Sequence, residues 1–159
     1  METNTLTIQQ PEKRRGTRAE AFRNRVKIRL ATNEMGPHIR DVLAENGIEL
    51  PEAKWDAVFP TWLIATVEDE VIGCCQVLLA KPVGFVEFLF VRPSVGFKLR
   101  AIAVRKLIIQ GLATLYHGGC QYCGGVVSRN NEKFHGVLEK LNFVQAGNAT
   151  VMLKRLTSE

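Results

Sequence analysis

The fold is decided by residues 83–117, which read VGFVEFLFVRPSVGFKLRAIAVRKLIIQGLATLYH. Val83–Val91 is rich in β-branched and aromatic residues and is closed by Arg92-Pro93, which predicts a strand. From Lys98 to His117 the apolar residues recur at helical spacing, and two glycines follow, which predicts a long helix. An apolar strand that leads directly into a long helix is typical of domains in which helices cover a sheet.

The flanking segments extend this pattern along the chain. We expect further strands at Val26–Leu30, Trp62–Val67, Val71–Ala80, Tyr122–Ser128, Asn142–Gln145 and Thr150–Leu156, and helices at Glu34–Asn46 and Asn131–Leu141. Glu68-Asp69-Glu70 predicts a hairpin, and Gly47 ends the first helix. The order β-α-β-β-β-α-β-α-β-β predicts a single α/β (α+β) domain with a mixed, mostly antiparallel sheet flanked by helices.

Composition places the chain among ordinary globular proteins. Its 159 residues are 46% apolar and 23% charged, which fits one domain with its own core and excludes collagen, coiled-coil and membrane-bundle architectures. The longest apolar runs are far shorter than the roughly 20 residues of a membrane span. Met1–Gln10 is polar and starts no signal-peptide pattern. We therefore expect a cytoplasmic protein.

The net charge of +5 is unevenly distributed. Residues 1–25 carry six basic and three acidic side chains, so we interpret them as a basic N-terminal tail ahead of a domain at 26–159. A short helix over Arg18–Arg25 is compatible with this tail. Two interpretations remain open: a solvated arm, or an arm that docks on an acidic partner, another subunit or nucleic acid. Between Glu87 and Glu132 there is no acidic residue, and this local positive field suits an anionic ligand.

The chain has four cysteines, in two pairs. Cys74 and Cys75 are adjacent and would point to opposite faces of a strand, so they cannot converge on one metal. Cys120-x-x-Cys123 has the spacing of a zinc knuckle, but no second pair of ligands stands at a matching separation. We expect reduced thiols and no metal site.

Two stretches resemble motifs of the GNAT superfamily of acetyl-CoA-dependent N-acyltransferases. Phe88–Pro93 is similar to the family's apolar strand, which ends at a Val-x-Pro corner before the long helix. Ser128–Asn131 followed by Phe134–Phe143 is similar to the family's Asn and its Tyr-Glu-Lys-Leu-Gly-Phe ending. The resemblance covers about Val26–Leu156. It implies a GNAT-like fold, acetyl-CoA as co-substrate, and a small-molecule or peptide amine as acceptor.

The resemblance also implies where the cofactor binds, because the family holds the CoA pyrophosphate on the backbone amides that open the long helix. The implied cofactor-binding residues are Val91, Gly96, Phe97, Lys98, Leu99, Arg100, Ala101 and Asn131. A helix N-terminus attracts an anion, and Lys98 and Arg100 add positive charge. Phe97 and Leu99 stand roughly where the family prefers small residues, so the segment is either a phosphate cradle or a plain helix start with solvated basic residues. Asn131 equally suits a helix N-cap.

The resemblance further implies two catalytic positions. Glu87 lies where family members often carry the general base, although a strand carboxylate can also face solvent or pair with a basic residue. The family's acid, a Tyr, aligns with Leu138, which has no proton to give. His135 lies one helical turn earlier and is the candidate substitute, the alternative being a structural or surface histidine. Asn142 replaces the family's Gly and suits a left-handed helix C-cap.

Three functions compete. The first is an N-acetyltransferase that uses acetyl-CoA and an amine. The second is a non-catalytic GNAT-fold binding or structural protein that docks through the basic tail, since the phosphate loop and the Tyr are both altered. Compact chains of this type are familiar from bacteriophages, so the resemblance also implies a phage-encoded protein in the host cytoplasm or the virion. The third, a nucleic-acid binder, is least favoured because the chain has no recognised stacking or groove-reading motif.

Overall fold

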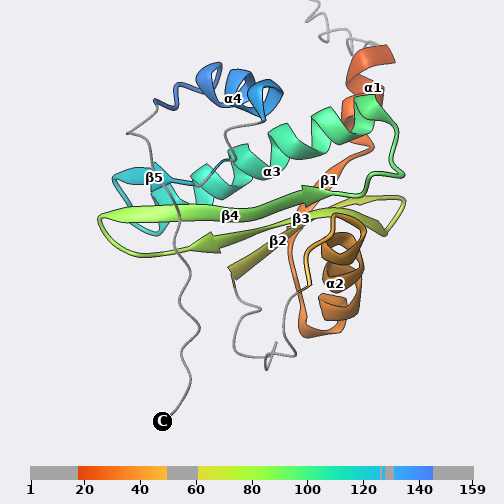
Figure 1. Ribbon diagram of the computed structural model, residues 1–159, viewed down its shortest axis with the longest axis horizontal. Helices are drawn as coiled ribbons and strands as arrows, with labels where there is room; N and C mark the ends of the chain where they lie inside the picture. Colours follow the sequence, from red (N-terminus) through yellow and green to blue (C-terminus); the bar gives the residue numbers. More distant parts are fainter. Residues whose placement is uncertain (1–17, 50–60, 126, 128–130, 145–159) are drawn as a thin grey trace, which may run out of the picture.

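The computed structural model describes residues 18–49, 61–125, 127 and 131–144 of the chain (Figure 1). The strands are β1 (Lys27–Leu30), β2 (Trp62–Val67), β3 (Glu70–Leu78), β4 (Val83–Val91) and β5 (Tyr122–Gly124). The helices are α1 (Arg18–Asn24), the 3₁₀ turn η1 (Asn33–Met35), α2 (Gly36–Glu45), α3 (Phe97–His117) and α4 (Glu132–Glu139). The strands form one five-stranded sheet in chain order. Neighbours are antiparallel except β4 and β5, which run parallel because α3 connects them.

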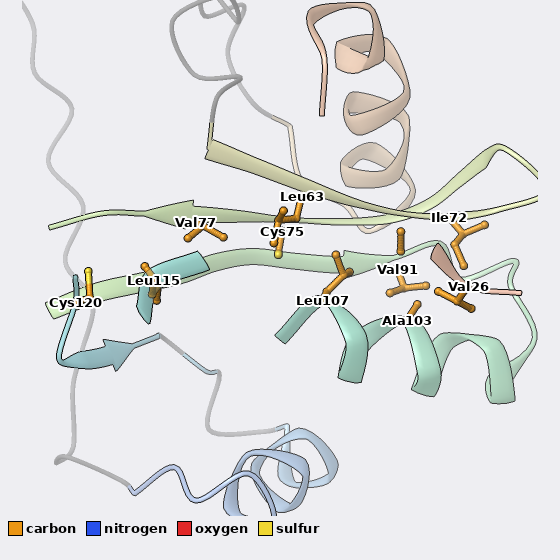
Figure 2. Packing of buried hydrophobic residues seen from close by; sticks show 11 residues of the cluster. Val26, Leu63, Ile72, Cys75, Val77, Val91, Ala103, Leu107, Leu115 and Cys120 are labelled. Carbon is orange, nitrogen blue, oxygen red and sulfur yellow. The ribbon is translucent and has the colours of Figure 1, made fainter. Parts of the chain in front are cut away.

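Each face of the sheet carries its own apolar core. Side chains alternate between the faces along a strand, so that Leu63 belongs to the core under α3 whereas Ile64 belongs to the core under α2. In the first core Ala103 of α3 lies beside Val91 and Val26 (Figure 2). The two helices therefore lie on opposite sides of the sheet, and α4 lies on the side of α3 (Figure 1).

The predicted fold class is confirmed, with small shifts at the ends of the strands. Trp62–Val67 and Val83–Val91 are strands with the predicted bounds. The strand predicted at Val71–Ala80 is Glu70–Leu78. The strand predicted at Tyr122–Ser128 is shorter and ends at Gly124; residues 126 and 128 lie outside the described residues.

The predicted helices are also present. The first, predicted at Glu34–Asn46, is divided into η1 and α2, because Pro37 suits the first turn of an α-helix and no later position. Gly47, with φ of 75°, ends it as predicted. The helix predicted at Asn131–Leu141 is α4, and the short helix compatible with the tail is α1.

The predicted hairpin between β2 and β3 is confirmed. Val67 pairs with Glu70, which leaves Glu68 and Asp69 as the two turn residues, with φ of 51° and 66°. Two consecutive positive φ values are the mark of the type I′ turn that matches the twist of paired strands.

One strand prediction is wrong in its described part. Asn142 was expected to start a strand, but it lies in a turn with φ of 63° and ends α4. Its N–H donates to the carbonyl of Glu139 at 2.9 Å, and the N–H of Phe143 donates to that of Leu138 at 3.0 Å. These two bonds form the Schellman closure of a helix, for which Asn142 was also predicted to be suited. Gln145 and Thr150–Leu156 lie outside the described residues.

Candidate functional site

The candidate site is built on the outer edge of β4. On one side β4 pairs with β3 from Phe85 to Val91, whereas on the other side β5 pairs with it only from Val83 to Phe85. In the described part of the chain, β4 therefore has no strand partner on this edge from Val86 to Val91. The N–H and C=O groups of such an edge can bond an extended ligand as a neighbouring strand would.

A cavity of about 520 Å³ lies along this edge. Its walls are Val86–Val91 of β4, Asn46 and Ile48 after α2, a stripe on α3 formed by Arg100, Val104 and Ile108, β5 with the residues after it, and α4 with Phe143. Apart from Glu87, Arg100, Asn46 and Asn131, the lining side chains are apolar or a cysteine. Such a cavity suits a ligand that is apolar over much of its length and carries a few polar groups.

A β-bulge interrupts β4 in the middle of the cavity wall. Gln76 pairs with Glu87 and Cys74 pairs with Phe90, so that Phe88 and Leu89 together stand opposite the single residue between them on β3. Phe88 has φ of 48°, a conformation that is strained for an aromatic residue. Its ring lies 5.9 Å from that of Trp62 in the core under α2. Bulges redirect side chains and backbone groups, and they are frequent beside active sites.

Glu87 lies directly before this bulge and lines the cavity. Its side chain is half-buried. The two ion pairs among the described residues join Arg25 to Glu68 and Arg92 to Glu45, so neither of them engages Glu87. A carboxylate in this position can accept a proton from a ligand in the cavity.

The N-terminus of α3 has the features of an anion site. Gly96 is the N-cap and provides no side chain to bond the first amides, and the first turn has no acidic residue. The first intrahelical bond runs from the N–H of Arg100 to the carbonyl of Gly96 at 3.1 Å. The amides of residues 97–99 therefore precede the helical ladder, and they lie at the positive end of the dipole of a 21-residue helix.

The two large residues of this turn lie outside the cavity. The side chain of Phe97 is 80% exposed, and Leu99 packs against the core under α3. Neither residue is among those that line the cavity. Gly96 has open space around it, since a Cβ added there would meet no atom within 4 Å.

On α4, one predicted residue faces the cavity and the other does not. Asn131 lines the cavity and also caps the helix, because its Oδ1 accepts a hydrogen bond from the N–H of Phe134 at 3.3 Å. The next cavity residues on this helix are Phe134 and Leu138, which follow at helical spacing. His135 is half-buried on the adjoining face and is not a lining residue.

The cavity therefore brings together four of the ten site residues predicted from the sequence. Glu87, Val91, Arg100 and Asn131 line it. Gly96, Phe97, Lys98, Leu99 and Ala101 lie around the start of α3, and His135 lies beside the cavity on α4.

Several lining residues were not predicted. Asn46 and Ile48 flank Gly47 at the end of α2, far away in sequence from β4, and the helix-end signal of Gly47 does not indicate a cavity. Gly124 and Gly125 carried a usable signal, because consecutive glycines often mark a close backbone approach. A Cβ at Gly124 would lie 2.9 Å from Cε1 of Phe85, so the absence of a side chain lets β5 meet β4 where the cavity begins.

Cys123 places a thiol in the cavity wall beside this point. Burial raises the pKa of the Cys123 thiol, the nearby thiol of Cys120 adds to this effect, and a hydrogen bond from the backbone of Val86 opposes it. The group is therefore a neutral thiol at neutral pH. Among the described residues, no cluster of three or more His, Cys, Asp or Glu side chains is positioned to hold a metal ion.

Comparisons with known proteins agree on the fold. No family model and no curated protein sequence matches the chain. Among solved structures, the aminoglycoside acetyltransferase AAC(6′)-Iy, in complex with the bisubstrate analogue CoA-S-monomethyl-acetylneamine, is similar with a TM-score of 0.69 and 22% identity over 82% of this chain and 99% of that one.

Two further structures are similar at lower sequence identity. A transcriptional regulator from Bacillus halodurans C-125 has a TM-score of 0.68 and 13% identity over 81% of this chain and 99% of that one. N-acetylglutamate synthase from Neisseria gonorrhoeae, complexed with coenzyme A and N-acetyl-glutamate, has a TM-score of 0.58 and 19% identity over 70% of this chain and 27% of that one.

The chain has the fold of the GNAT acetyltransferases, as its motifs indicated. The parallel β4–β5 pair, connected by α3 and open beyond Phe85, is the part of this fold on which the candidate site lies. None of the helices in the described ranges is long and apolar enough to cross a lipid bilayer.

Proposed function

We propose that this protein is an N-acyltransferase that transfers an acetyl group from acetyl-CoA to an amine. The observation that carries the proposal is the position of the cavity: it follows the open edge of β4 and is bordered by the N-terminal half of α3, whose first amides have no capping side chain. Solved structures of the same fold are described as complexes with CoA. The cavity and the helix end match the two halves of CoA, an extended pantetheine arm and an anionic pyrophosphate.

Each part of the site would hold one part of the co-substrate. The edge of β4 from Val86 to Val91 would bond the amides of the pantetheine arm, with Asn131 on the opposite wall. The amides of residues 97–99, together with Lys98 and Arg100, would hold the pyrophosphate. Phe97 and Leu99 would leave the cavity free for the pantetheine arm, since the first is exposed, the second packs against the core under α3, and neither lines the cavity.

Glu87 would serve as the general base. The acceptor arrives as an ammonium ion, and its nitrogen can attack only after it has lost a proton. Glu87 would take that proton, directly or through a water molecule, from its place on the cavity wall. Acetyl-CoA supplies a thioester, whose acetyl group forms the new C–N bond while the C–S bond breaks. The departing thiolate would be protonated by water or by His135, which adjoins the cavity on α4.

A second function is favoured by Leu138. It lines the cavity at the position where the family's Tyr acid is expected, and it cannot donate a proton. A protein that binds CoA or a related ligand without catalysis, and that docks through the basic residues 1–25, would have no need of that acid. Most of this tail, residues 1–17, lies outside the described residues.

Titration of the purified protein with CoA and acetyl-CoA by calorimetry tests both functions. The enzyme requires binding in the micromolar range, about −8 kcal/mol, together with CoA release when a panel of primary amines is added. Binding without release from any amine would favour the second function. Absence of binding at millimolar CoA would reject the proposed cradle and cavity as a CoA site.

A further inference from the structure

α2 covers the opposite face of the sheet from α3, yet its C-terminal end reaches the open edge of β4. Asn46, the C-cap, and Ile48 both line the cavity. The backbone of this end is fixed, because the N–H of Gly47 donates to the carbonyl of Ala44 at 2.9 Å and that of Ile48 donates to Leu43 at 3.0 Å. With φ of 75° at Gly47, these bonds form a Schellman closure. The side chain of Asn46 therefore starts from a well-defined backbone.

The side-chain amide of Asn46 connects two elements. Its Nδ2 group donates to the carbonyl of Val42 in α2 at 2.8 Å and to the carbonyl of Val91 in β4 at 3.3 Å. Only the NH₂ group can fill this position, because the amide oxygen would face two carbonyl oxygens. One neutral side chain thus holds the last residue of β4 against the end of α2.

A second contact, between Arg92 and Glu45, also holds the end of β4 against the end of α2. Arg92 forms an ion pair with Glu45, the last residue of α2. Its Nε also donates to the carbonyl of Val71 at 2.9 Å, and its backbone N–H donates to that of Ile72 at 2.8 Å. The corner at which β4 ends is therefore held by α2 on one side and by β3 on the other.

We propose that Asn46 is a positioning residue of the acyl-CoA site; this inference rests on the proposed function. The affinity for a ligand that bonds both the edge of β4 and the first amides of α3 depends on the placement of these two elements relative to each other. Only residues 92–96 separate Val91 from the start of α3. Asn46 holds Val91 in place, and so it also fixes the point from which residues 92–96 lead to α3. Both halves of the site are then aligned before the ligand arrives, which lowers the entropy cost of binding.

The test compares a ligand that spans both halves of the site with one that occupies only the helix end. The probes are CoA and 3′-phosphoadenosine diphosphate, which lacks the pantetheine arm, titrated by calorimetry or NMR well below the melting temperature. With Asn46→Ala we expect CoA to bind about tenfold more weakly, as for the loss of one hydrogen bond. The affinity for 3′-phosphoadenosine diphosphate should stay within about twofold.

Two further variants make the result specific. Asn46→Asp keeps the shape of the side chain but replaces the donor by an oxygen, and it should weaken CoA binding at least as much as Asn46→Ala does. Asn33→Asp introduces the same charge at an exposed position of η1 that does not line the cavity, and it should change neither affinity. Asn46→Asp also replaces Asn46→Ala as the test if the alanine variant fails to fold.

The outcomes separate this inference from the proposed function. If wild-type protein binds CoA and Asn46→Ala binds it equally well, the positioning role is overturned and the acyltransferase proposal stands. If the variant loses affinity for both probes to the same extent, Asn46 serves the general integrity of the fold and the positioning role is again overturned. If the wild-type protein binds no CoA, both proposals are overturned.

Discussion

Leu115 of α3 lies directly over Gly84 of β4, so close that a Cβ added at Gly84 would overlap its Cδ2 atom. The same added atom would lie 3.0 Å from Sγ of Cys120 and 3.1 Å from the carbonyl oxygen of Leu78. Gly84 is also the partner of Cys123 in the short pairing of β4 with β5. α3 is therefore packed onto the sheet at the point beyond which the two strands separate and the cavity opens.

Gly84→Ala should lower the free energy of unfolding by about 1–3 kcal/mol, because the new methyl group forces Leu115 and the backbone apart. Urea denaturation measures the change. Gly136→Ala in α4 is the matched control: a Cβ there meets no atom within 4 Å, and alanine should stabilise the helix by up to about 1 kcal/mol. Equal stability of Gly84→Ala and wild type would show that α3 can shift away from β4 at little cost.

Glu87→Gln should lower kcat by about 100-fold or more, since a general base contributes at least this factor. The CoA dissociation constant should remain within about twofold, because the substitution keeps the shape of the side chain and changes only its charge. Glu34→Gln, at an exposed position of η1, is the control for a change of charge alone. An unchanged kcat in Glu87→Gln would remove this residue from the mechanism.

The regular elements could be predicted from the sequence because their signals are local. Trp62–Val67 and Val83–Val91 are rich in β-branched and aromatic residues and are bounded by turn residues, and their bounds agree with the structure. Gly47 marks the end of α2 for a stereochemical reason that holds in any fold, and Pro37 could have marked its start, which was predicted at Glu34 instead.

The shape of the site was beyond sequence reasoning because it depends on pairing between distant residues. Phe88 adopts φ of 48° only because β3 and β4 differ by one residue across the bulge, and nothing in its own neighbourhood predicts a left-handed conformation. Asn46 bonds Val91, which is 45 residues away. Leu138 lines the cavity and His135 does not, a difference decided by the packing of α4 rather than by the spacing of its residues.

Cys75 gives the stability of the protein a pH dependence. Burial raises the pKa of its thiol from 9.0 to about 12. Between these pH values the unfolded chain loses the proton and the folded chain keeps it, so stability that is present below pH 9 is lost as the pH rises toward 12. The loss is at most about 1.4 kcal/mol per pH unit.

Urea denaturation of wild type and Cys75→Ala at several pH values between 8 and 11 measures this effect. Lysines and tyrosines also titrate in this range, but both proteins contain them, so the difference between the two proteins reports the contribution of the Cys75 thiol. The wild-type protein should be the more stable at pH 8, because alanine leaves a small void in the core under α3. The difference in the free energy of unfolding should narrow as the pH rises. A constant difference would mean that the thiol ionises equally in the folded and unfolded states.

Lys106 of α3 anchors the C-terminal end of α1. Its Nζ donates to the carbonyl of Arg23 at 2.9 Å and to the carbonyl of Val26, which is almost fully buried, at 2.6 Å. Lys106→Met keeps the aliphatic part of the side chain and removes both donors, so we expect a loss of about 1 kcal/mol in the free energy of unfolding. Amide hydrogen exchange in α1 should accelerate, whereas Lys133→Met at an exposed position of α4 should leave it unchanged. Unaltered exchange in α1 would show that other contacts hold this helix.

Two substitutions on α4 identify the group that donates a proton to the leaving thiolate. Leu138 lines the cavity, so Leu138→Tyr places a phenol where the family's acid is expected, and kcat should rise by about tenfold or more if protonation limits the rate. His135 is not a lining residue, and we expect His135→Ala to keep kcat within about twofold, with water as the donor. Steady-state kinetics with acetyl-CoA and the amine identified in the release assay measures both. A large fall in kcat for His135→Ala, with CoA affinity preserved, would instead assign the acid to His135 and require α4 to turn toward the cavity when the substrate binds.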